Sequence, residues 1–238
     1  MTVHAYENGY RALGRQLLLL PVEWTADGWF RVKPEIAADS AIPMPVTGSS
    51  QQEFLDPSDT FDAPELGLQW GFWHEYDPKR FDTGKGLLRL AARGKYLLDT
   101  SVLATAVGGH SYTIEVDVEI EPECEAGLLL FYNPDHATGI TLSPDGIKVR
   151  VANGLTFSKG SKAIPRATLR IVNDDQELDF YYRLPGQPWQ RAQESAEISG
   201  MHHNVLGGFL DVRPALCAWG AGNGFFRNFR YWPKVNLH

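Results

Sequence analysis

The stretch YTIEVDVEI, residues 112–120, alternates strictly between apolar and polar side chains. Successive side chains of a β-strand point to opposite faces, so this alternation predicts a strand with one buried face and one face toward water. A strand with one wet face is typical of an antiparallel sheet, because the strands of a parallel sheet are buried on both faces. The apolar face of this stretch carries Tyr112, Ile114, Val116, Val118 and Ile120.

The rest of the chain repeats this pattern in short pieces. The segments 167–173 (ATLRIVN) and 177–183 (ELDFYYR) flank an Asp-Asp-Gln turn, and residues 141–154 predict a second hairpin that turns at Pro-Asp-Gly. No segment of ten or more residues shows a convincing helical period of 3.6, so the sequence predicts an all-β sandwich or barrel of antiparallel strands. Further predicted strands are 126–133, 205–214 and 224–233, and the predicted inner faces include Leu129 and Ile171.

The composition is that of a soluble, turn-rich globular protein. Of the 238 residues, 12% are aromatic, 23 are Gly and 15 are Pro, and the formal net charge is −7. A negative chain repels phosphate backbones, which argues against nucleic acid as a partner. Cys124 and Cys217 each adjoin an apolar run and fit no metal or redox spacing, which favours buried free thiols.

Membrane and export signals are also not found in the sequence. No apolar run approaches the about 20 residues of a membrane helix, which argues against a membrane partner. The apolar residues 17–22 are too few for a signal peptide and lack a cleavage site after them. The localisation is therefore unknown, and we expect a cytoplasmic one if the chain is the whole protein.

Residues 33–53 divide the chain. They are rich in Pro, Ala and Ser and lack a strand pattern, which predicts a linker. Before it, residues 1–32 already read as a strand, a glycine turn, an apolar strand and a Trp-containing turn, and after it a β-domain is predicted over residues 54–238. A piece of 32 residues is too small to build its own core, so we expect it to pack on the β-domain or on a further domain.

The opening residues also carry a family resemblance. Residues 3–30, VHAYENGYRALGRQLLLLPVEWTADGWF, resemble the last stretch of the five-bladed β-propeller of glycoside hydrolase family 43, the β-xylosidase and α-L-arabinofuranosidase family. Residues 54–73, 86–94, 126–133, 169–183 and 202–233 resemble the concanavalin A-like β-sandwich that follows the propeller in many members. The resemblance implies a jelly-roll antiparallel sandwich over residues 54–238, preceded by a propeller-closing remnant over residues 1–32.

The resemblance assigns no catalytic residue to this chain. It implies an aspartate base, a glutamate acid and an aspartate that tunes the acid, all on earlier propeller blades, and no position here matches those motifs. Inverting hydrolysis needs two carboxylates about 6.5–9.5 Å apart across the sugar ring. Glu7, Glu23 and Asp27 of residues 1–32 have no evident partner for that role. We therefore expect the chain to be inactive by itself and to require no cofactor.

Aromatic and polar side chains are the candidates for contact with a sugar or with a neighbouring domain. Flat aromatic faces stack on sugar rings, although the same side chains also fill cores, as predicted for Trp70 and Phe72. For the adjacent His202 and His203, the alternative to such a contact is that they belong to a loop that packs against the following strand. The candidate contact residues are Trp73, His74, Tyr132, Asn133, His202 and His203.

Carboxylates and one histidine offer weaker candidates. Asp56, Asp59 and Asp62 could supply oxygen ligands to a structural Ca²⁺, but their spacing differs from an EF-hand loop and favours a turn with local hydrogen bonds. His4 is a further metal candidate, because the resemblance places a histidine of the closing strand at the propeller axis. The glutamates of EIEPECE, residues 119–125, read as solvated charge at a sheet edge rather than as an acid–base pair.

Two functions follow from the resemblance. The first is an accessory sandwich that supports a family 43 active site on xylan or arabinan. The second is a carbohydrate-binding module for xylo- or arabino-oligosaccharides. A self-contained glycosidase is disfavoured, because the catalytic carboxylates are not found. The expected partners are a plant cell-wall oligosaccharide, a catalytic propeller domain, or a second copy of this chain bound through residues 2–32. Within one chain, we expect residues 2–32 to pack on the sandwich through Trp24, Trp29 and Phe30.

Overall fold

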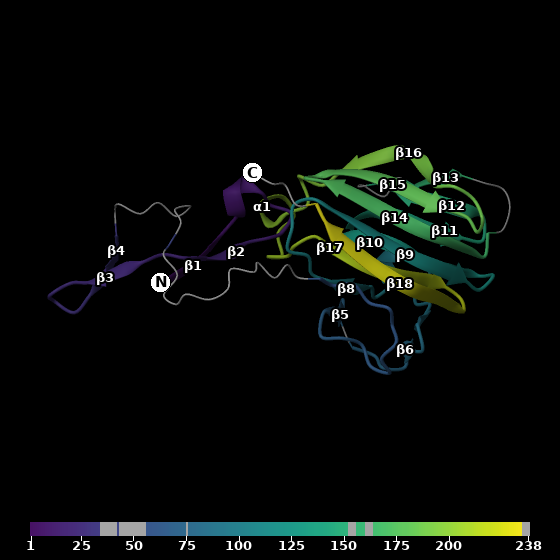
Figure 1. Ribbon diagram of the computed structural model, residues 1–238, viewed down its shortest axis with the longest axis horizontal. Coiled ribbons are helices and arrows are strands. Elements are labelled where there is room, and N and C mark those ends of the chain that lie inside the picture. The colour runs from purple at the N-terminus through teal and green to yellow at the C-terminus, as the bar shows by residue number, and fades with distance from the viewer. Residues whose placement is uncertain (34–41, 43–55, 75, 152–155, 160–163, 235–238) are drawn as a thin grey trace.

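The computed structural model in Figure 1 shows a two-layer β-sandwich that carries a narrow N-terminal extension. It describes residues 1–33, 42, 56–74, 76–151, 156–159 and 164–234. The predicted linker over residues 33–53 lies, except for Lys33 and Ile42, outside the described residues.

Two seven-stranded antiparallel sheets form the sandwich. The first sheet contains β5 (Trp70–Phe72), β8 (Leu103–Thr105), β10 (Cys124–Asn133), β11 (His136–Ser143), β12 (Gly146–Arg150), β13 (Thr156–Lys159) and β17 (Arg213–Gly220). The second sheet contains β6 (Phe81–Gly84), β7 (Leu87–Ala91), β9 (Tyr112–Ile120), β14 (Arg166–Asp174), β15 (Glu177–Arg183), β16 (Gln190–Glu197) and β18 (Asn223–Pro233). The strand orders are β13-β12-β11-β10-β17-β8-β5 and β16-β15-β14-β9-β18-β7-β6.

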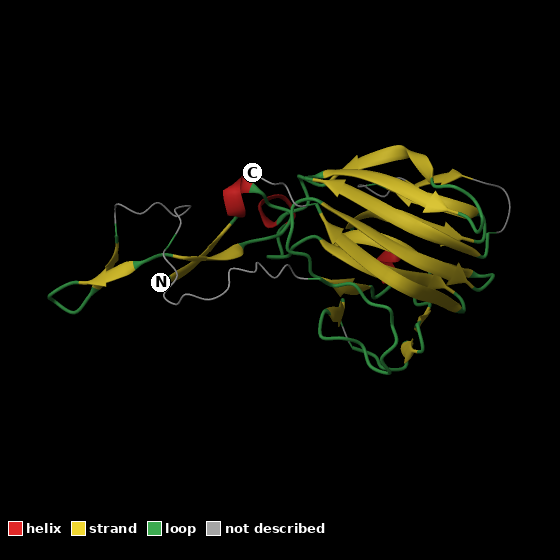
Figure 2. Ribbon diagram, in the orientation of Figure 1, coloured by secondary structure: helices red, strands yellow, loops and turns green. Residues whose placement is uncertain are grey.

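The alternating stretch forms β9, at the middle of the second sheet. It pairs with β14 on one side and β18 on the other. Ile114 and Val116 are fully buried in the core between the sheets, together with Ile171. The two predicted hairpins are β14–β15 and β11–β12. Figure 2 shows how little of the described chain is helical, and the all-β prediction is confirmed.

The helical segments are short. They are α1 (His203–Leu206) and two 3₁₀ turns at Glu7–Gly9 and Leu97–Asp99. None of the described helices has the length and apolar character that crossing a membrane requires.

The prediction for Leu129 is wrong. β10 is buried along both of its faces, so its sequence shows no alternation from which a face could be chosen. Leu128 and Leu130 lie in the core between the sheets, whereas Leu129 lies on the opposite face of β10 with Phe131 and Cys217. Cys217 and Cys124 are buried free thiols, as predicted.

The predicted strand over residues 205–214 is also wrong in its first half. Residues 203–206 form α1, and Gly207, Gly208 and Phe209 then have φ values of 72°, 86° and 53°. Three consecutive residues with positive φ cannot continue a strand, which needs φ near −120° to −140°. The strand β17 begins only at Arg213.

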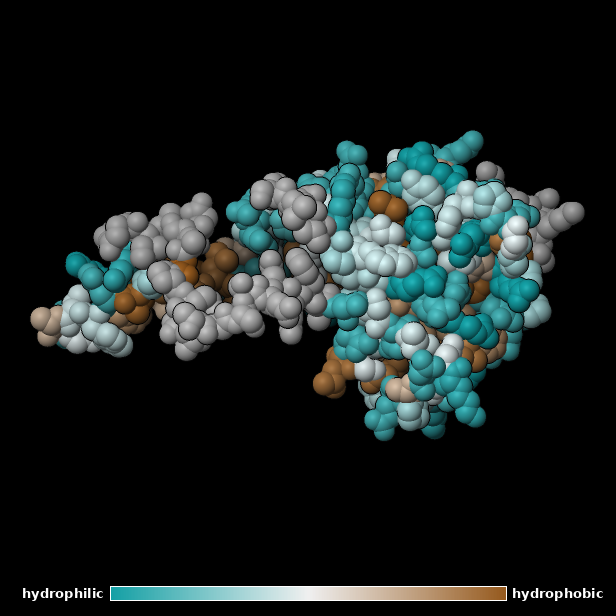
Figure 3. Space-filling model, viewed as in Figure 1, coloured by the Kyte–Doolittle hydropathy of each residue, from teal (hydrophilic) through white to brown (hydrophobic). Residues whose placement is uncertain are grey.

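The N-terminal extension consists of two small sheets. β1 (Thr2–Ala5) pairs with β2 (Gln16–Leu19), and β3 (Val22–Trp24) pairs with β4 (Phe30–Val32). The β3–β4 hairpin stands at the far end from the sandwich (Figure 1). The expected packing of Trp24, Trp29 and Phe30 on the sandwich is therefore wrong, and these side chains are 75%, 71% and 43% exposed. Brown apolar atoms are visible along the extension in Figure 3.

Candidate functional site

The base of the extension is built into the sandwich through Tyr10. Its side chain is buried, its ring stacks on His110 with centroids 3.9 Å apart, and its hydroxyl lies 2.5 Å from the carbonyl oxygen of Asp175. Burial raises the pKa of Tyr10 to about 12. The backbone N–H of Val212 also donates to the carbonyl oxygen of Ala12 over 2.7 Å. Tyr10, Ala12 and Leu13 are thus part of the sandwich core, unlike the tip of the extension.

Gly14 allows the chain to leave the sandwich closely beside residue 211. Its φ is 69°, and an added Cβ would lie 3.1 Å from the Cβ of Asp211. Both features favour glycine at this position, because a side chain would be strained by the backbone and crowded by the neighbour.

A cluster of rings and polar groups lies where the extension meets α1. We call this the junction cluster; it contains Tyr6, Arg15, His202, His203, Asn204 and Phe209. Tyr6 donates to the side-chain oxygen of Asn204 over 3.3 Å. The Arg15 guanidinium lies 5.6 Å from the ring centroid of Tyr6 and 5.3 Å from that of Phe209. The extension and the loop after α1 therefore share one surface.

The histidines of the junction cluster have different roles. His202 is buried, and its Nδ1 accepts from the backbone N–H of Asn204 over 3.2 Å, so it caps α1. Burial lowers the pKa of His202, which keeps the ring neutral and able to accept. His203 instead stacks on Phe209 with centroids 3.7 Å apart. The two adjacent histidines therefore have separate partners.

Phe209 is the most exposed ring of the junction cluster. Its side chain is 70% exposed, although its backbone is held at a positive φ and its ring is held between His203 and Arg15. Tyr132 supports this loop, because its hydroxyl donates to the carbonyl oxygen of Gly207. Sequence reasoning missed Tyr6, Arg15 and Phe209. The Gly-Gly pair before Phe209 was the available signal, since paired glycines favour a turn over a strand.

The remaining sugar-contact candidates lie elsewhere. Trp73 packs on the outer face of the first sheet, with its ring centroid 5.2 Å from that of Phe131, and His74 lies beside it at 5.1 Å. Asn133 accepts from the backbone N–H groups of Asp135 and His136 and so closes the β10–β11 turn. In the described part of the chain, no hydrogen bond or ring contact joins Trp73, His74 or Asn133 to the junction cluster.

The aspartate candidates for a metal form local turns. Asp56 accepts from the backbone N–H of Ser58, and Asp59 accepts from the N–H of Phe61 and from the Trp70 indole. Asp62 accepts from the Thr60 hydroxyl. His4 is exposed on β1, opposite Leu17. Among the described residues, no three His, Cys, Asp or Glu side chains are grouped so that they could hold a metal ion.

The expectation that the glutamates of residues 119–125 lie at a sheet edge is wrong for Glu119 and Glu125, whereas Glu121 and Glu123 lie in the turn around Pro122 between β9 and β10. Glu119 is the penultimate residue of β9 and Glu125 lies in β10, and both strands have a neighbour on each side. Glu125 is buried and accepts from Thr141, Lys148 and Arg150 over 2.6, 3.1 and 2.7 Å. The Arg150 guanidinium also lies 4.7 Å from the ring centroid of Trp219. This group of charges holds three strands of the first sheet together.

Known proteins resemble the chain in both sequence and structure. The family model for the beta xylosidase C-terminal concanavalin A-like domain matches residues 58–232. Comparison with curated protein sequences found no match.

Three solved structures illustrate the structural likeness. The xyloglucan PUL protein GH43B of Bacteroides ovatus has a TM-score of 0.80 and 20% identity, over 94% of this chain and 48% of that chain. The GH43 protein BlXynB of Bacillus licheniformis has a TM-score of 0.74 and 25% identity, over 93% and 47%. The xylan β-1,4-xylosidase of Bacillus halodurans C-125 has a TM-score of 0.78 and 20% identity, over 93% and 48%.

This chain therefore spans about half the length of these solved proteins. The family match covers well over half of this chain, and its bounds contain nearly all of the sandwich. The chain belongs to the family of β-xylosidase C-terminal concanavalin A-like domains.

Proposed function

We propose that this chain is the accessory C-terminal region of a family 43 glycoside hydrolase that acts on xylan-type plant polysaccharides. In this proposal the extension is the surface that contacts a catalytic β-propeller domain. Two comparisons support it: the solved relatives are about twice as long, and one of them is a xylan β-1,4-xylosidase. The contact with a propeller is our inference from the surface of the extension.

The observation that carries the proposal is the apolar surface of the extension. We call it the extension strip; it contains Leu17, Leu19, Trp24, Trp29 and Phe30. Leu17 and Leu19 are 80% and 66% exposed, and they alternate along β2 with less exposed neighbours. Fully burying a large apolar side chain is worth about 1.5–3 kcal/mol. A domain that covers the strip would therefore gain a large part of its binding free energy from it.

The backbone of the extension supports the same proposal. Each of its two sheets has only two strands, and an isolated two-stranded hairpin is marginally stable in water. Among the described residues, each strand of these sheets is paired on one side only, and such an edge pairs readily with a strand of another domain. A neighbouring domain would thus stabilise the extension through both its backbone and its side chains.

The carboxylates of the extension are engaged in local contacts. Glu23 accepts from Arg31 over 2.5 Å across the β3–β4 hairpin. Asp27 accepts from the Thr25 hydroxyl in the hairpin turn, and this hydrogen bond lowers the pKa of Asp27. A carboxyl with a lowered pKa is ionised at neutral pH and cannot act as the general acid of a glycosidase. These contacts favour an accessory role over a self-contained active site.

Hydrolysis by the chain alone tests the accessory role. Purified chain is assayed on nitrophenyl β-xyloside and nitrophenyl α-L-arabinofuranoside, beside a mock purification from the same host. We expect no turnover above the mock, because general acid–base catalysis alone is worth roughly 10²–10⁴-fold. Turnover that follows the chain through purification, and that is lost in the variants Glu23→Gln or Asp27→Asn, would overturn the proposal.

A further inference from the structure

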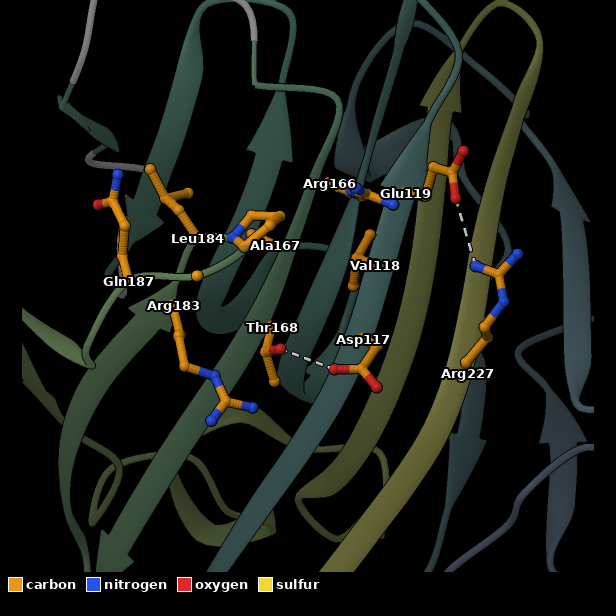
Figure 4. A pocket seen from close by; sticks show the side chains of 12 residues that line it. Asp117, Val118, Glu119, Arg166, Ala167, Thr168, Arg183, Leu184, Gln187 and Arg227 are labelled. Atoms are coloured by element: carbon orange, nitrogen blue, oxygen red, sulfur yellow. Dashed lines mark hydrogen bonds and ion pairs between the residues drawn. The ribbon is translucent and has the colours of Figure 1, made fainter.

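A groove crosses the outer face of the second sheet, away from the junction cluster. Its volume is about 590 Å³, and it runs over β9, β14, β15 and β18. The turn over residues 184–187, between β15 and β16, forms one wall. Figure 4 shows that its charged side chains come from several strands, from Arg183 on one side to Arg227 on the other.

The groove lies at the end of the sheet that is remote from the extension. Tyr10 contacts the carbonyl oxygen of Asp175, just after β14 ends, whereas the groove is lined by Arg166 at the start of β14. A strand rises about 3.4 Å per residue, so the eight steps from Arg166 to Asp174 span roughly 27 Å. The groove and the base of the extension therefore lie at opposite ends of β14.

The charges in the groove are not balanced. Three guanidinium groups and two carboxylates line it, in a chain whose net charge is −7. Glu119 pairs with Arg227 over 3.3 Å, and Asp117 accepts from Thr168 and Asn228 over 2.7 and 2.9 Å. Within the described ranges, neither Arg166 nor Arg183 forms an ion pair with a carboxylate, and the Arg183 guanidinium instead lies 4.8 Å from the Trp189 ring.

Arg166 and Arg183 project from neighbouring strands on the same face. Arg183 pairs in register with Thr168, two residues after Arg166, so the two arginines are diagonal neighbours. Diagonal neighbours lie about 7–8 Å apart at the backbone, within reach of long side chains. Figure 4 shows the two guanidinium groups apart, so the long side chains of Arg166 and Arg183 must turn toward each other to bind one carboxylate. Such binding would form charge-assisted hydrogen bonds, which are stronger than neutral ones.

We propose that this groove binds the carboxylate of an acidic sugar, a uronic acid residue of a polysaccharide. The lining combines the apolar side chain of Leu184 with polar Thr168 and Gln187, whereas the side chains of Val118 and Ala167 below them belong to the core. A pyranose ring presents both C–H and O–H groups, so it matches such a surface. The inference does not depend on the role proposed for the extension, because it needs no catalytic domain.

An acidic peptide is the competing ligand, and the topology disfavours it. An extended peptide usually binds a β-protein by adding a strand to a free sheet edge. The strands under the groove, β9, β14, β15 and β18, each have a paired neighbour on both sides. The groove therefore offers side chains but no free backbone edge to a peptide.

Calorimetric titration of the full chain tests the proposal. The probes are a xylotetraose that bears one glucuronic acid substituent, unsubstituted xylotetraose, and a short oligoglutamate peptide. Charge-assisted hydrogen bonds are worth about 1.5–3 kcal/mol, so we expect the acidic sugar to bind at least about ten-fold more tightly than the neutral one. This preference should fall as salt is added, because the arginines are partly exposed.

The variant Arg166→Gln/Arg183→Gln should abolish the preference for the acidic sugar. The matched control is Arg93→Gln, an exposed arginine outside the groove, which should keep it. Circular dichroism confirms that each variant is folded. Equal affinity for both sugars, no binding of the acidic sugar, tighter binding of oligoglutamate, or a preference that survives in Arg166→Gln/Arg183→Gln would each overturn the proposal.

Discussion

The hydroxyl of Tyr10 lies 2.5 Å from the carbonyl oxygen of Asp175, a residue 165 positions later in the chain. Asp175 has a φ of 63° in the turn between β14 and β15, so its carbonyl oxygen is presented by a tight turn. This contact joins the base of the extension to the second sheet. The extension is therefore fixed at its base through Tyr10 and exposed at its tip.

The variant Tyr10→Phe should lower the free energy of unfolding by about 0.5–1.5 kcal/mol, because the hydrogen bond from the hydroxyl of the buried Tyr10 to the carbonyl oxygen of Asp175 is lost. Urea unfolding measures this change. The control is Tyr96→Phe, whose side chain is 67% exposed and should contribute nothing measurable. Equal losses in the two variants would show that the Tyr10 hydroxyl does not anchor the extension.

Alkaline pH should destabilise the protein through its buried tyrosines. Burial raises the pKa of Tyr10 and Tyr231 to about 12, and that of Tyr112 well above its usual value. A tyrosine in the unfolded chain has a pKa of about 10, so the unfolded state releases these protons at a lower pH than the folded state. The stability that is present below pH 10 is therefore lost between about pH 10 and 12. Urea unfolding across this window should show a smaller loss for Tyr10→Phe than for the unmodified chain. The same pH dependence in both proteins would contradict the assignment to Tyr10.

Neither thiol should react while the protein is folded. Cys124 and Cys217 are fully buried, and burial raises the pKa of Cys124 to about 12 and that of Cys217 further still. The thiolate is the reactive form, so both groups are protonated and shielded at neutral pH. An aromatic disulfide reagent should label both thiols in denaturant and neither in buffer. Rapid labelling of the native protein would show that one of the two sites opens.

Glu125→Gln should destabilise the first sheet strongly. The substitution removes the buried carboxylate that pairs with both Lys148 and Arg150, and breaking a buried ion pair costs about 3 kcal/mol. The matched control is Glu119→Gln, because Glu119 is exposed and pairs with Arg227, and exposed pairs are worth about 0–1 kcal/mol. Thermal unfolding of the two variants should separate them, and similar melting temperatures would contradict the structural role of Glu125.

The sequence was most informative where one face of a strand is wet. β9 and the β14–β15 hairpin could be predicted because their polar residues alternate with buried ones. β10 could not, since both of its faces are buried and its residues 126–132 form a continuously apolar run. The position of Glu125 was wrongly predicted for a related reason. A glutamate in a strand sequence favours a sheet edge, because the sequence does not show that Lys148 and Arg150 lie beside it in the folded sheet.

The junction cluster was only partly predictable. His202 and His203 were recognised as candidates, but Tyr6 and Arg15, which complete the cluster, lie nearly 200 residues earlier in the chain. Only the folded chain brings such residues together, because local patterns carry no information on long-range contacts. The direction of the extension was unpredictable for the same reason, and Trp24 and Trp29 were wrongly expected to contact the sandwich.

The central claim is that the extension strip is a surface that another domain covers. Size-exclusion chromatography with light scattering, at micromolar concentration, tests this claim. The proteins compared are the full chain, the triple variant Trp24→Ser/Trp29→Ser/Phe30→Ser and the control variant Leu68→Ser. Leu68 is an exposed apolar residue of the sandwich, outside the strip. Without its covering domain, the strip should drive association of the unmodified chain and of the control, whereas the triple variant should be monomeric. If all three proteins have the same monomeric mass, the strip needs no cover and the claim is contradicted.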